Sequence, residues 1–298
     1  MTTPERAEPR ILSAGDRYII VEFARANSMR MNMYALELAR RIDEEARDGI
    51  LELLPMFVSL LVHYDASRVS REALEDMCGS LLRDIEALDD LEHQSPLIEI
   101  PVCYGDPWTR ACVEDYARKI APIEDNPTYV AAVNGLRDVE HLFALHSATE
   151  HWVGGVGFWP GLPDMMPLDP RSRLSVPKYD PPRIWTETGA VGVGGGFTSI
   201  YPMRTPGGYH LIGRTPAPIY DLQRRSGPAF RDSVVLFRPG DRVRFRRIGI
   251  DEFEHIENAV AAGTFALEIA EQRTFSLREY ESWLAEQEAS LVGDQQRD

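Results

Sequence analysis

The alternation of hydrophobic and polar residues over the first hundred positions predicts a small unit of strands and helices. Residues 17–23 (RYIIVEF) form a β-branched and aromatic run that is typical of a strand. Residues 29–48 carry periodic apolar positions among charges, which predicts an amphipathic helix. Residues 50–63 contain two apolar runs, and we expect Pro55 to mark the break between two strands.

A second helix and a closing strand complete this unit. Ser70 is a good N-cap for a helix over residues 70–88, because its side chain can accept a hydrogen bond from an amide of the first turn. Residues 97–102 (LIEIPV) are typical of a strand. The order β-α-β-β-α-β predicts a ferredoxin-like N-terminal domain over residues 1–100. It carries no catalytic motif, so we expect it to serve packing or partner docking.

The remaining residues, 101–298, predict a second domain of mainly β character. Asp106 and Pro107 begin the first of three short helices, because Asp is a favoured N-cap and Pro fits the first turn. These helices form an insert over about residues 106–147. The pattern then turns to strands, and a C-terminal α/β extension over about 251–292 follows, with a helix near 252–262, a strand at 264–269 and a helix at 276–291. The predicted fold class is α+β.

Prolines, glycines and aromatic residues crowd the segment from Phe158 to Pro216. A helix would not tolerate them at this density, because Pro removes a backbone donor and Gly adds backbone entropy. Apolar β-formers nevertheless remain between them. The segment therefore predicts short strands joined by shaped loops, and such loops are where binding sites are usually built.

Composition excludes several classes of partner. The 298 residues are 44% hydrophobic and 27% charged, with a net charge of −15. A nucleic acid or an anionic membrane surface would be repelled without a segregated basic patch. The nearest candidate is the run of Arg242, Arg244, Arg246 and Arg247, which we interpret as the solvated face of a strand. Neither partner class is expected.

The cysteines and the hydropathy pattern indicate a cytoplasmic protein. Cys78, Cys103 and Cys112 are odd in number and lack metal or redox spacing, so we expect reduced thiols and no metal site. The N-terminal residues carry no apolar signal core. No apolar run approaches the roughly 18 residues that a membrane-spanning helix needs.

Self-contained catalytic motifs are absent from the sequence. His141 and His146 lack metal-ligand spacing, so structural roles are favoured for both. The glycines of residues 192–196 lack the ending of a phosphate-binding loop, and no helix is predicted after them. We expect these glycines to let the backbone approach a ligand or another chain closely between two strands.

Polar groups suited to a carbonyl or carboxylate substrate gather near the end of this segment. We expect Pro206-Gly-Gly208 to form a hairpin that places Tyr201 and His210 on neighbouring strands, with Tyr209 and Arg214 close by. Preorganised donors of this kind stabilise a developing oxyanion. Arg214 has a second interpretation, in which it only ties loops together through backbone carbonyls.

Short motifs that are shared with one protein family run through most of the chain. They are Gly15-Asp-Arg-Tyr18, Leu60-Leu-Val-His-Tyr-Asp65, Gly105-Asp-Pro-Trp-Thr-Arg110, Val133-Asn-Gly-Leu136, Pro167-Leu-Asp-Pro-Arg171, Pro177-Lys-Tyr179, Pro182-Arg183, Trp185-Thr186, Gly189-Ala-Val-Gly192, Pro206-Gly-Gly-Tyr209, Gly213-Arg-Thr215, Pro239-Gly-Asp-Arg-Val-Arg244 and Thr274-Phe-Ser-Leu-Arg-Glu-Tyr280. In these residues the chain resembles the KipI-like family, also called allophanate hydrolase subunit 1 or the B subunit of 5-oxoprolinase, and within it the KipI-like half of the urea carboxylase carboxyltransferase region.

The resemblance implies a cyclophilin-like β-barrel and an active site shared with a KipA-like (allophanate hydrolase subunit 2) partner. It implies transfer of CO2 from carboxybiotin to an amide or urea-type nitrogen. No cofactor is expected on this chain alone: biotin would be carried by a biotin carrier domain, and ATP would be used by a biotin carboxylase domain. The chain is therefore expected to be inactive by itself.

The polar groups described above supply the catalytic candidates. Arg214 and Tyr201 are expected to donate to an oxyanion or carboxylate, and His210 is a weaker candidate for proton transfer. The substrate-binding candidates are Phe197, Thr198, Pro160, Gly161, Tyr209, Gly195 and Gly196. Two departures bear on the substrate. Phe197 stands where the oxoprolinase branch has Gln, whereas the loop at residues 158–163 (FWPGLP) resembles the oxoprolinase type.

Two alternative functions follow from the same family. The chain resembles the B subunit of an ATP-dependent 5-oxoprolinase or related lactamase, which would hydrolyse its substrate without biotin. It also resembles a KipI-type inhibitor of a histidine kinase, which would not be an enzyme. The C-terminal sequence Thr274–Tyr280 favours the carboxylase branch.

Overall fold

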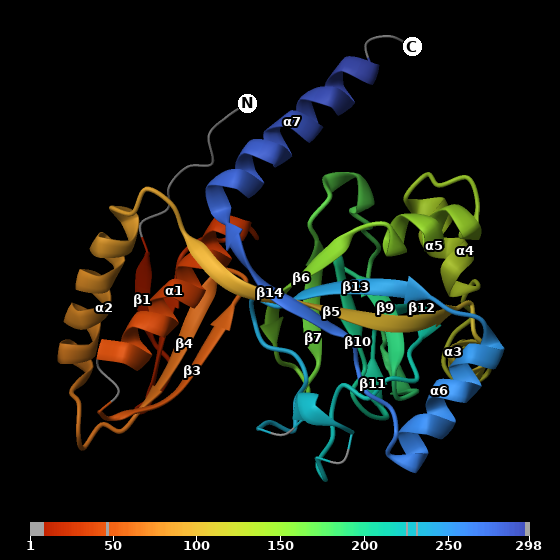
Figure 1. The fold of residues 1–298 in the computed structure, drawn as a ribbon, viewed down its shortest axis with the longest axis horizontal. Coiled ribbons are helices and arrows are strands. Elements are labelled where there is room, and N and C mark those ends of the chain that lie inside the picture. Colours follow the sequence, from red (N-terminus) through yellow and green to blue (C-terminus); the bar gives the residue numbers. More distant parts are fainter. Residues whose placement is uncertain (1–8, 46–47, 225, 231, 296–298) are drawn as a thin grey trace. The chain divides into compact units, whose positions relative to one another are not determined.

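The computed structural model describes residues 9–45, 48–224, 226–230 and 232–295. The chain forms two compact units, one made of residues 1–95 with 273–298 and the other of residues 96–272. The C-terminal extension expected over about residues 251–292 is thereby divided between the two units. Both units combine sheets with helices, so the α+β class predicted from the sequence is confirmed (Figure 1).

The first unit is an antiparallel sheet covered by helices. Its strands and helices are β1 (Arg10–Ser13), β2 (Tyr18–Glu22), α1 (Met29–Glu45), β3 (Ile50–Met56), β4 (Ser59–Tyr64), α2 (Arg71–Glu86) and α7 (Leu277–Gln295). The sheet order is β1-β2-β4-β3. Helix α1 packs across β3 and β4, and α2 packs beside α1 (Figure 1). The predicted cap of α2 is confirmed, because the Ala73 amide donates to Ser70 Oγ over 3.1 Å.

Two predictions for this unit were wrong. Residues 97–102 do not close its sheet: they belong to β5 (Glu92–Tyr104) and pair in parallel with β13 (Arg242–Arg247), while β1 occupies the edge beside β2. Ile98, Ile100 and Val102 are buried in the core of the second unit, which explains the apolar alternation without the first sheet. Pro55 lies inside β3, and the chain turns after Met56 instead. An edge strand such as β3 tolerates the missing amide.

The second unit is built around a closed barrel. Its strands and helices include α3 (Pro107–Lys119), α4 (Asn126–Val133), α5 (Val139–Ser147), β6 (Glu150–Val156), β7 (Pro163–Pro167), β8 (Arg183–Thr186), β9 (Ala190–Gly194), β10 (Phe197–Ile200), β11 (Thr205–Gly207), β12 (His210–Arg214) and α6 (Ile250–Ala262), with short 3-10 helices at Pro170–Ser172 and Pro228–Phe230. The sheet order is β12-β9-β10-β7-β6-β13-β5, and β5 pairs again with β12, which closes the barrel. Its cyclophilin-like kinship stays a prediction.

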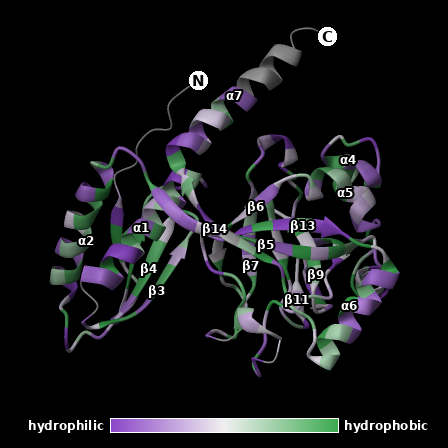
Figure 2. Ribbon diagram, viewed as in Figure 1, coloured by the Kyte–Doolittle hydropathy of each residue, from purple (hydrophilic) through white to green (hydrophobic). Residues whose placement is uncertain are grey.

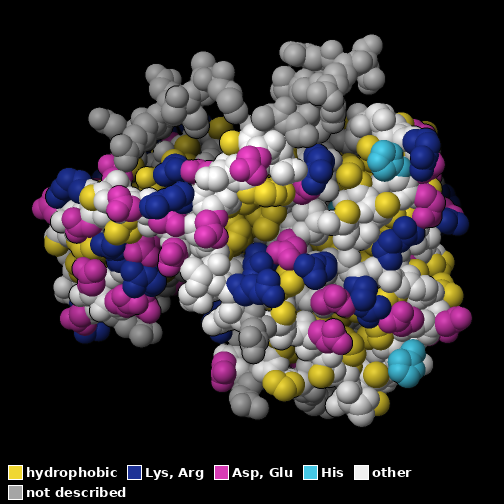
Figure 3. All heavy atoms as spheres, turned by 45° about the horizontal axis from the view of Figure 1, so that its top comes forward, with side chains coloured by type: hydrophobic (Ala, Val, Ile, Leu, Met, Phe, Trp, Pro, Cys, Tyr) yellow, Lys and Arg dark blue, Asp and Glu magenta, His cyan; other side chains and the backbone are white. Residues whose placement is uncertain are grey.

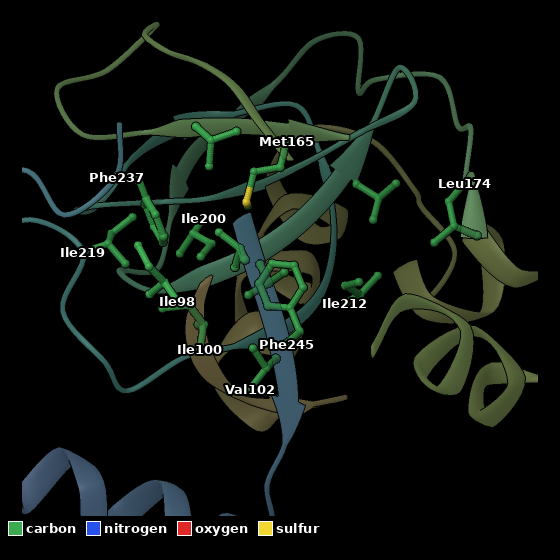
Figure 4. Packing of buried hydrophobic residues seen from close by; sticks show 14 of the residues in the cluster. Ile98, Ile100, Val102, Met165, Leu174, Ile200, Ile212, Ile219, Phe237 and Phe245 are labelled. Atoms are coloured by element: carbon green, nitrogen blue, oxygen red, sulfur yellow. The ribbon is translucent and has the colours of Figure 1, made fainter. Parts of the chain in front are cut away.

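Hydrophobic side chains from most of these strands converge inside the barrel. Figure 4 shows Met165, Ile200, Ile212 and Phe245 pointing toward one another from β7, β10, β12 and β13. A second, smaller apolar cluster lies on the outer side of the same strands and includes Leu162, Tyr201, Tyr209 and Leu211. Because successive strand residues alternate between faces, the barrel wall has an inner and an outer face of different composition.

The predicted insert helices are all present. Asp106, Asp125 and Asp138 cap α3, α4 and α5 through their side chains. The strand expected at residues 264–269 was wrong, because β14 covers Ile269–Ser276 instead. The apolar run before it supplies Leu267 to the barrel core, so its hydrophobic pattern reflects packing and not strand alternation.

The arginines of β13 form ion pairs with acidic side chains. Arg242 and Arg244 contact Glu150 over 2.9 and 2.6 Å, and Arg246 contacts Glu99 over 2.7 Å. The strand is strongly hydrophilic (Figure 2), and acidic and basic side chains are interspersed on the face seen in Figure 3. Arg244 and Arg246 thus form a paired, solvated face, as the sequence predicted, whereas the paired Arg242 side chain is only 11% exposed. Among the described residues, none of the helices combines the length and the apolarity that crossing a membrane requires.

Candidate functional site

The barrel wall separates the predicted site residues onto two faces. Thr198 and His210 lie on the inner face, with the core residues Val193 and Ile200. Phe197, Tyr201 and Tyr209 lie with the outer cluster. The hairpin expected at residues 206–208 was wrong, because β11 pairs with β8 and β9 separates β10 from β12.

Inside the barrel, Thr198 takes part in a buried polar network. Its hydroxyl lies 3.0 Å from His146 Nε2, and the Tyr104 hydroxyl lies 2.8 Å from His146 Nδ1. Burial and the nearby His151 lower the pKa of His146 well below its usual value. The imidazole is therefore neutral at pH 7, and its ring nitrogens are occupied by these two hydroxyls. The structural role expected for His146 agrees with this arrangement.

His210 is also buried and neutral. Its Nε2 lies 2.9 Å from the Pro177 carbonyl oxygen, and its ring stacks on Tyr129 and meets Tyr179 edge-on. Burial, as the largest cause, lowers the pKa of His210 to about 4. Because Nε2 must donate to the carbonyl, Nδ1 is the unprotonated nitrogen, and among the described residues it has no hydrogen-bond partner. A role in proton transfer stays a prediction.

These buried histidines predict a stability that falls with acid. The folded-state pKa of His210, about 4, lies below the ordinary value of 6.5, so the unfolded chain binds the proton more readily. The contribution of the neutral His210 to the free energy of unfolding is complete above pH 6.5. It is lost as the pH falls toward 4, at up to about 1.4 kcal/mol per pH unit. We expect His210→Gln to flatten the dependence of unfolding free energy on pH over this range, measured by guanidinium denaturation.

The comparison with wild type also controls for Asp241, whose effect on the pH dependence of stability has the opposite sign. Burial raises the pKa of Asp241 to about 6, so its contribution has the opposite sign and is lost as the pH rises. This contribution is present in both proteins and cancels in the difference. Identical slopes for wild type and His210→Gln would contradict the buried neutral state of His210.

Tyr201 is buried beneath β11 and faces a buried arginine. A Cβ added at Gly207 would lie 2.2 Å from the Tyr201 hydroxyl, so only glycine fits above it. Arg183, 1% exposed, donates through Nη1 to the Tyr209 carbonyl over 2.6 Å and through Nη2 to the Tyr201 hydroxyl over 3.4 Å. Among the described residues no carboxylate forms an ion pair with Arg183. Its guanidinium instead fixes the segment that carries Tyr201 and Tyr209.

Arg214 lies on the outer face, at the other end of β12. Its guanidinium is 5.0 Å from the ring centroids of both Trp108 and Phe253. Its Nε donates to the Thr188 carbonyl over 2.8 Å, and its Nη2 lies 3.4 Å from Glu257. These contacts match the interpretation in which Arg214 ties loops together. Five residues of extended strand, about 16 Å, separate it from Tyr209.

The open part of the outer face carries a compact group that we call the Tyr209 cluster: Tyr209, Asp164, Ser199, Lys178 and Phe197. The Tyr209 hydroxyl donates to Asp164 Oδ1 over 3.1 Å, and Ser199 Oγ donates to the same oxygen over 2.5 Å. The Lys178 ammonium lies 4.9 Å from the centroid of the Tyr209 ring. Phe197 packs against the same apolar cluster. Burial, then the adjacent Asp164, raises the pKa of Tyr209, so it stays a neutral donor.

Two glycines of β9 leave the space that the Tyr209 side chain occupies. A Cβ added at Gly194 would lie 2.6 Å from Tyr209 Cδ1, and one at Gly192 would lie 2.9 Å from Tyr209 Cβ. Gly192 and Gly194 therefore allow a close approach to the Tyr209 side chain, and the approach to a ligand or another chain stays a prediction. Gly195 and Gly196, with φ of 61° and 91°, make the turn between β9 and β10. Both conformations favour glycine, so we interpret them as turn formers beside the cluster.

We expect Gly194→Ala to destabilise the protein by about 1–3 kcal/mol, because the added methyl displaces the Tyr209 ring. The control is Gly79→Ala in α2, where the nearest atom is a flexible Arg83 nitrogen at 3.8 Å. Removing a helical glycine there should stabilise by about 0.5–1 kcal/mol. Denaturant titration measures both changes, and equal effects of the two variants would contradict the packing described for Gly194.

The loop at residues 157–162 presents an exposed aromatic ring beside this face. Gly157 and Leu162 join its ends through a hydrogen bond of 3.0 Å, and the Trp159 amide donates to the Gly157 carbonyl over 2.7 Å. Phe158, between them, has a φ of 64° and is 77% exposed. A non-glycine residue in this conformation is strained, which is common at functional sites. Of the predicted residues here, Pro160 is exposed and Gly161 is buried against Tyr220.

Sequence reasoning missed Arg183, Asp164 and Lys178 as parts of this site. Arg183 and Lys178 were recognised only within family motifs, and Asp164 lies between apolar neighbours in a short strand. One signal was present in the composition. The chain has two lysines among 32 basic residues, so Lys178 is unusual in this sequence.

Two hollows lie elsewhere in the described part of the chain. One of about 1120 Å³ lies in the first unit, where its charged side chains include the ion pairs Arg10–Glu22 and Arg30–Glu281. Another of about 320 Å³ lies at the first turns of α3, α4 and α5. Neither is lined by a predicted site residue. Within the described part of the chain, no group of His, Cys, Asp or Glu side chains could hold a metal ion. The three cysteines are buried free thiols.

Comparison with known proteins places these observations in a family. A family model described as "Carboxyltransferase domain, subdomain C and D" matches residues 9–230. Urea amidolyase from Lachancea kluyveri is 33% identical over 287 residues, which are 94% of this chain and 15% of that protein. The 5-oxoprolinase B subunit of Bacillus subtilis is 29% identical over 252 residues, which are 82% of this chain and 95% of that protein. The crystal structure of the Kluyveromyces lactis urea carboxylase is 28% identical with a TM-score of 0.85, covering 99% of this chain and 27% of that chain.

Proposed function

Because the chain belongs to the carboxyltransferase subdomain C and D family, we propose that it is the subunit of a urea carboxylase-like enzyme that transfers a carboxyl group to an amide or urea-type nitrogen. The chain spans a small fraction of the urea amidolyase and urea carboxylase relatives, so the remaining functions must reside on other polypeptide segments. We place the second half of the active site on a KipA-like partner. Biotin would be delivered by a carrier domain, and ATP would be used by a biotin carboxylase.

The observation that carries this proposal is the Tyr209 cluster on the open side of the barrel. Phe197 offers a partly exposed apolar ring, and Asp164 and Lys178 add a negative and a positive group beside the buried Tyr209 ring. A planar amide, urea or ureido group fits this combination of a flat surface and polar edges. The residues present are thus suited to one wall of a site for such groups.

We assign different tasks to the predicted catalytic residues. Tyr201 and Arg214 act as positioning residues, because their polar groups already bond to Arg183, Thr188 and Glu257. Asp164, Lys178 and Phe197 contact the substrate, whose carboxyl group would come from carboxylated biotin, and the buried Tyr209 positions Asp164. Thr198 and His210 maintain the barrel interior behind this wall. The bond between the biotin nitrogen and the carboxyl carbon would break as the substrate nitrogen takes up the carboxyl group, and the proton lost by the substrate nitrogen would balance the charge left on that biotin nitrogen.

A second candidate is the B subunit of a biotin-independent 5-oxoprolinase. It is favoured by the match to nearly the whole length of the Bacillus subtilis protein. The match to urea amidolyase extends over more of this chain, and this chain carries Phe197 beside the cluster. An apolar ring there suits the flat face of a planar group, so we rank the carboxyltransferase first.

Reconstitution distinguishes these functions. The chain is combined with its KipA-like partner, a biotinylated carrier and a biotin carboxylase, and ATP turnover is measured with urea, guanidine and simple amides. Turnover that depends on substrate and is blocked by avidin supports the carboxyltransferase. Turnover with 5-oxoproline that is insensitive to avidin identifies the alternative instead. The absence of any substrate-dependent turnover would contradict both the carboxyltransferase and the 5-oxoprolinase function.

A further inference from the structure

The carboxylate of Asp164 is held firmly by one oxygen and open at the other. Tyr209 and Ser199 both donate to Oδ1, over 3.1 and 2.5 Å. Ser199 is 2% exposed and Tyr209 is 9% exposed, so both donors are fixed by packing. Among the described residues, no ion pair or hydrogen bond engages Oδ2 of the half-buried Asp164. The second oxygen is therefore a preoriented acceptor without a protein donor.

Lys178 supplies an unpaired cation on the same aromatic ring. The chain uses 30 arginines and only two lysines, Lys119 and Lys178. Lys119 forms an ion pair with Asp115 over 2.9 Å. Lys178 forms no ion pair among the described residues, and its ammonium lies 4.9 Å from the Tyr209 ring centroid. A compact ammonium with three donors is thus available beside Tyr209.

Asp164 and Lys178 carry opposite charges beside the Tyr209 ring but do not pair with each other, and this arrangement restricts the kind of ligand that can bind both. A simple anion would be repelled by Asp164, and a simple cation would be repelled by Lys178. A neutral group with N–H donors on one side and a carbonyl oxygen on the other satisfies both.

We propose that Asp164 and Lys178 form a recognition pair for a ureido group. Asp164 Oδ2 accepts from a ureido N–H, Lys178 Nζ donates to the ureido carbonyl, and the Tyr209 hydroxyl holds Asp164 in place through Oδ1. This deepens the proposed function and rests on it for the source of the ligand. That source is either a urea-type substrate or the ureido ring of biotin, which share this chemistry.

The two lysines allow a direct test on the full chain. With lysine isotopically labelled at Cε, the carbon–proton NMR spectrum contains one signal from each lysine, and Lys119→Arg assigns them. We expect 2-imidazolidinone, a cyclic urea, to shift the Lys178 signal in a saturable manner and to leave the Lys119 signal unchanged. Its N,N′-dimethyl derivative lacks the N–H donors, and we expect its affinity to be lower by about tenfold or more.

The Asp164→Asn variant makes the test specific to the pair. It keeps the shape of the side chain, and we expect it to weaken 2-imidazolidinone binding by about tenfold or more, because a charge-assisted acceptor is lost. Asp16→Asn, an exposed carboxylate of the first unit, is the matched control and should bind as wild type does. An unshifted Lys178 signal, or equal binding of the dimethyl derivative, would overturn the proposal.

Competition identifies the source of the ureido group. Displacement of 2-imidazolidinone by biocytin assigns the pair to the biotin ring, and displacement by urea alone assigns it to the substrate; either outcome supports the pair. This test is independent of turnover. Binding at Lys178 without carboxylation would refute the proposed function only, whereas carboxylation without binding at Lys178 would refute the recognition pair only.

Discussion

Replacing Arg183 with methionine is expected to lower the free energy of unfolding by about 3 kcal/mol. The guanidinium is 1% exposed and donates to the Tyr209 carbonyl, to Thr186 Oγ1 and to the Tyr201 hydroxyl. Methionine fills much of the volume but leaves these acceptors buried without donors. Each orphaned group costs about 1–3 kcal/mol, which sets the expected size.

Arg244→Met is the matched control for this substitution. The Arg244 side chain is 49% exposed, and its ion pair with Glu150 is at the surface. Exposed ion pairs contribute about 0–1 kcal/mol, so this variant should lie close to wild type. Guanidinium titration followed by circular dichroism measures both. If Arg183→Met were no less stable than Arg244→Met, Arg183 could not be the buried tie that fixes the Tyr201 and Tyr209 segment.

Asp164→Asn is expected to lower kcat/KM of the reconstituted complex by about 10–100-fold while leaving the fold intact. The amide can still accept from Tyr209 and Ser199 through its oxygen. Its nitrogen, however, presents N–H groups where the carboxylate presented a free acceptor, and a substrate N–H then meets another donor. Stability should change by less than about 1 kcal/mol, because the carboxylate is partly exposed.

The measurement is substrate-dependent ATP turnover, with the thermal unfolding midpoint recorded in parallel. Asp16→Asn removes the same charge from an exposed position and should leave both values unchanged. A kcat/KM for Asp164→Asn within about twofold of wild type would remove Asp164 from the site. A large fall in the unfolding midpoint would instead indicate that Asp164 stabilises the fold and does not act on the substrate.

Local patterns in the sequence were sufficient for most elements. The predicted caps at Ser70 and Asp106 are confirmed, because capping is a contact over three residues. Residues 97–102 show the limit. Their apolar alternation correctly indicated a strand, but the choice of sheet depends on pairing with residues 242–247, which no local pattern encodes.

The site shows the same limit more sharply. Phe197 and Thr198 are adjacent, so they must point to opposite faces of a strand, and this was predictable. Which face is interior depends on the closure of the barrel between β5 and β12. Asp164 and Lys178 come from separate segments and meet only at Tyr209. Their convergence depends on the tertiary fold, and the scarcity of lysine was the one signal for it in the sequence.

The most direct test of the outer-face site compares the two lysines in the reconstituted complex. We expect Lys178→Met to lower kcat/KM for the urea-type substrate by about tenfold or more, with an unchanged unfolding midpoint. Lys119→Met, which removes an ammonium paired with Asp115 on α3, should keep kcat/KM within about twofold of wild type. Equal kcat/KM values for Lys178→Met and wild type would show that the substrate does not meet this face of the barrel.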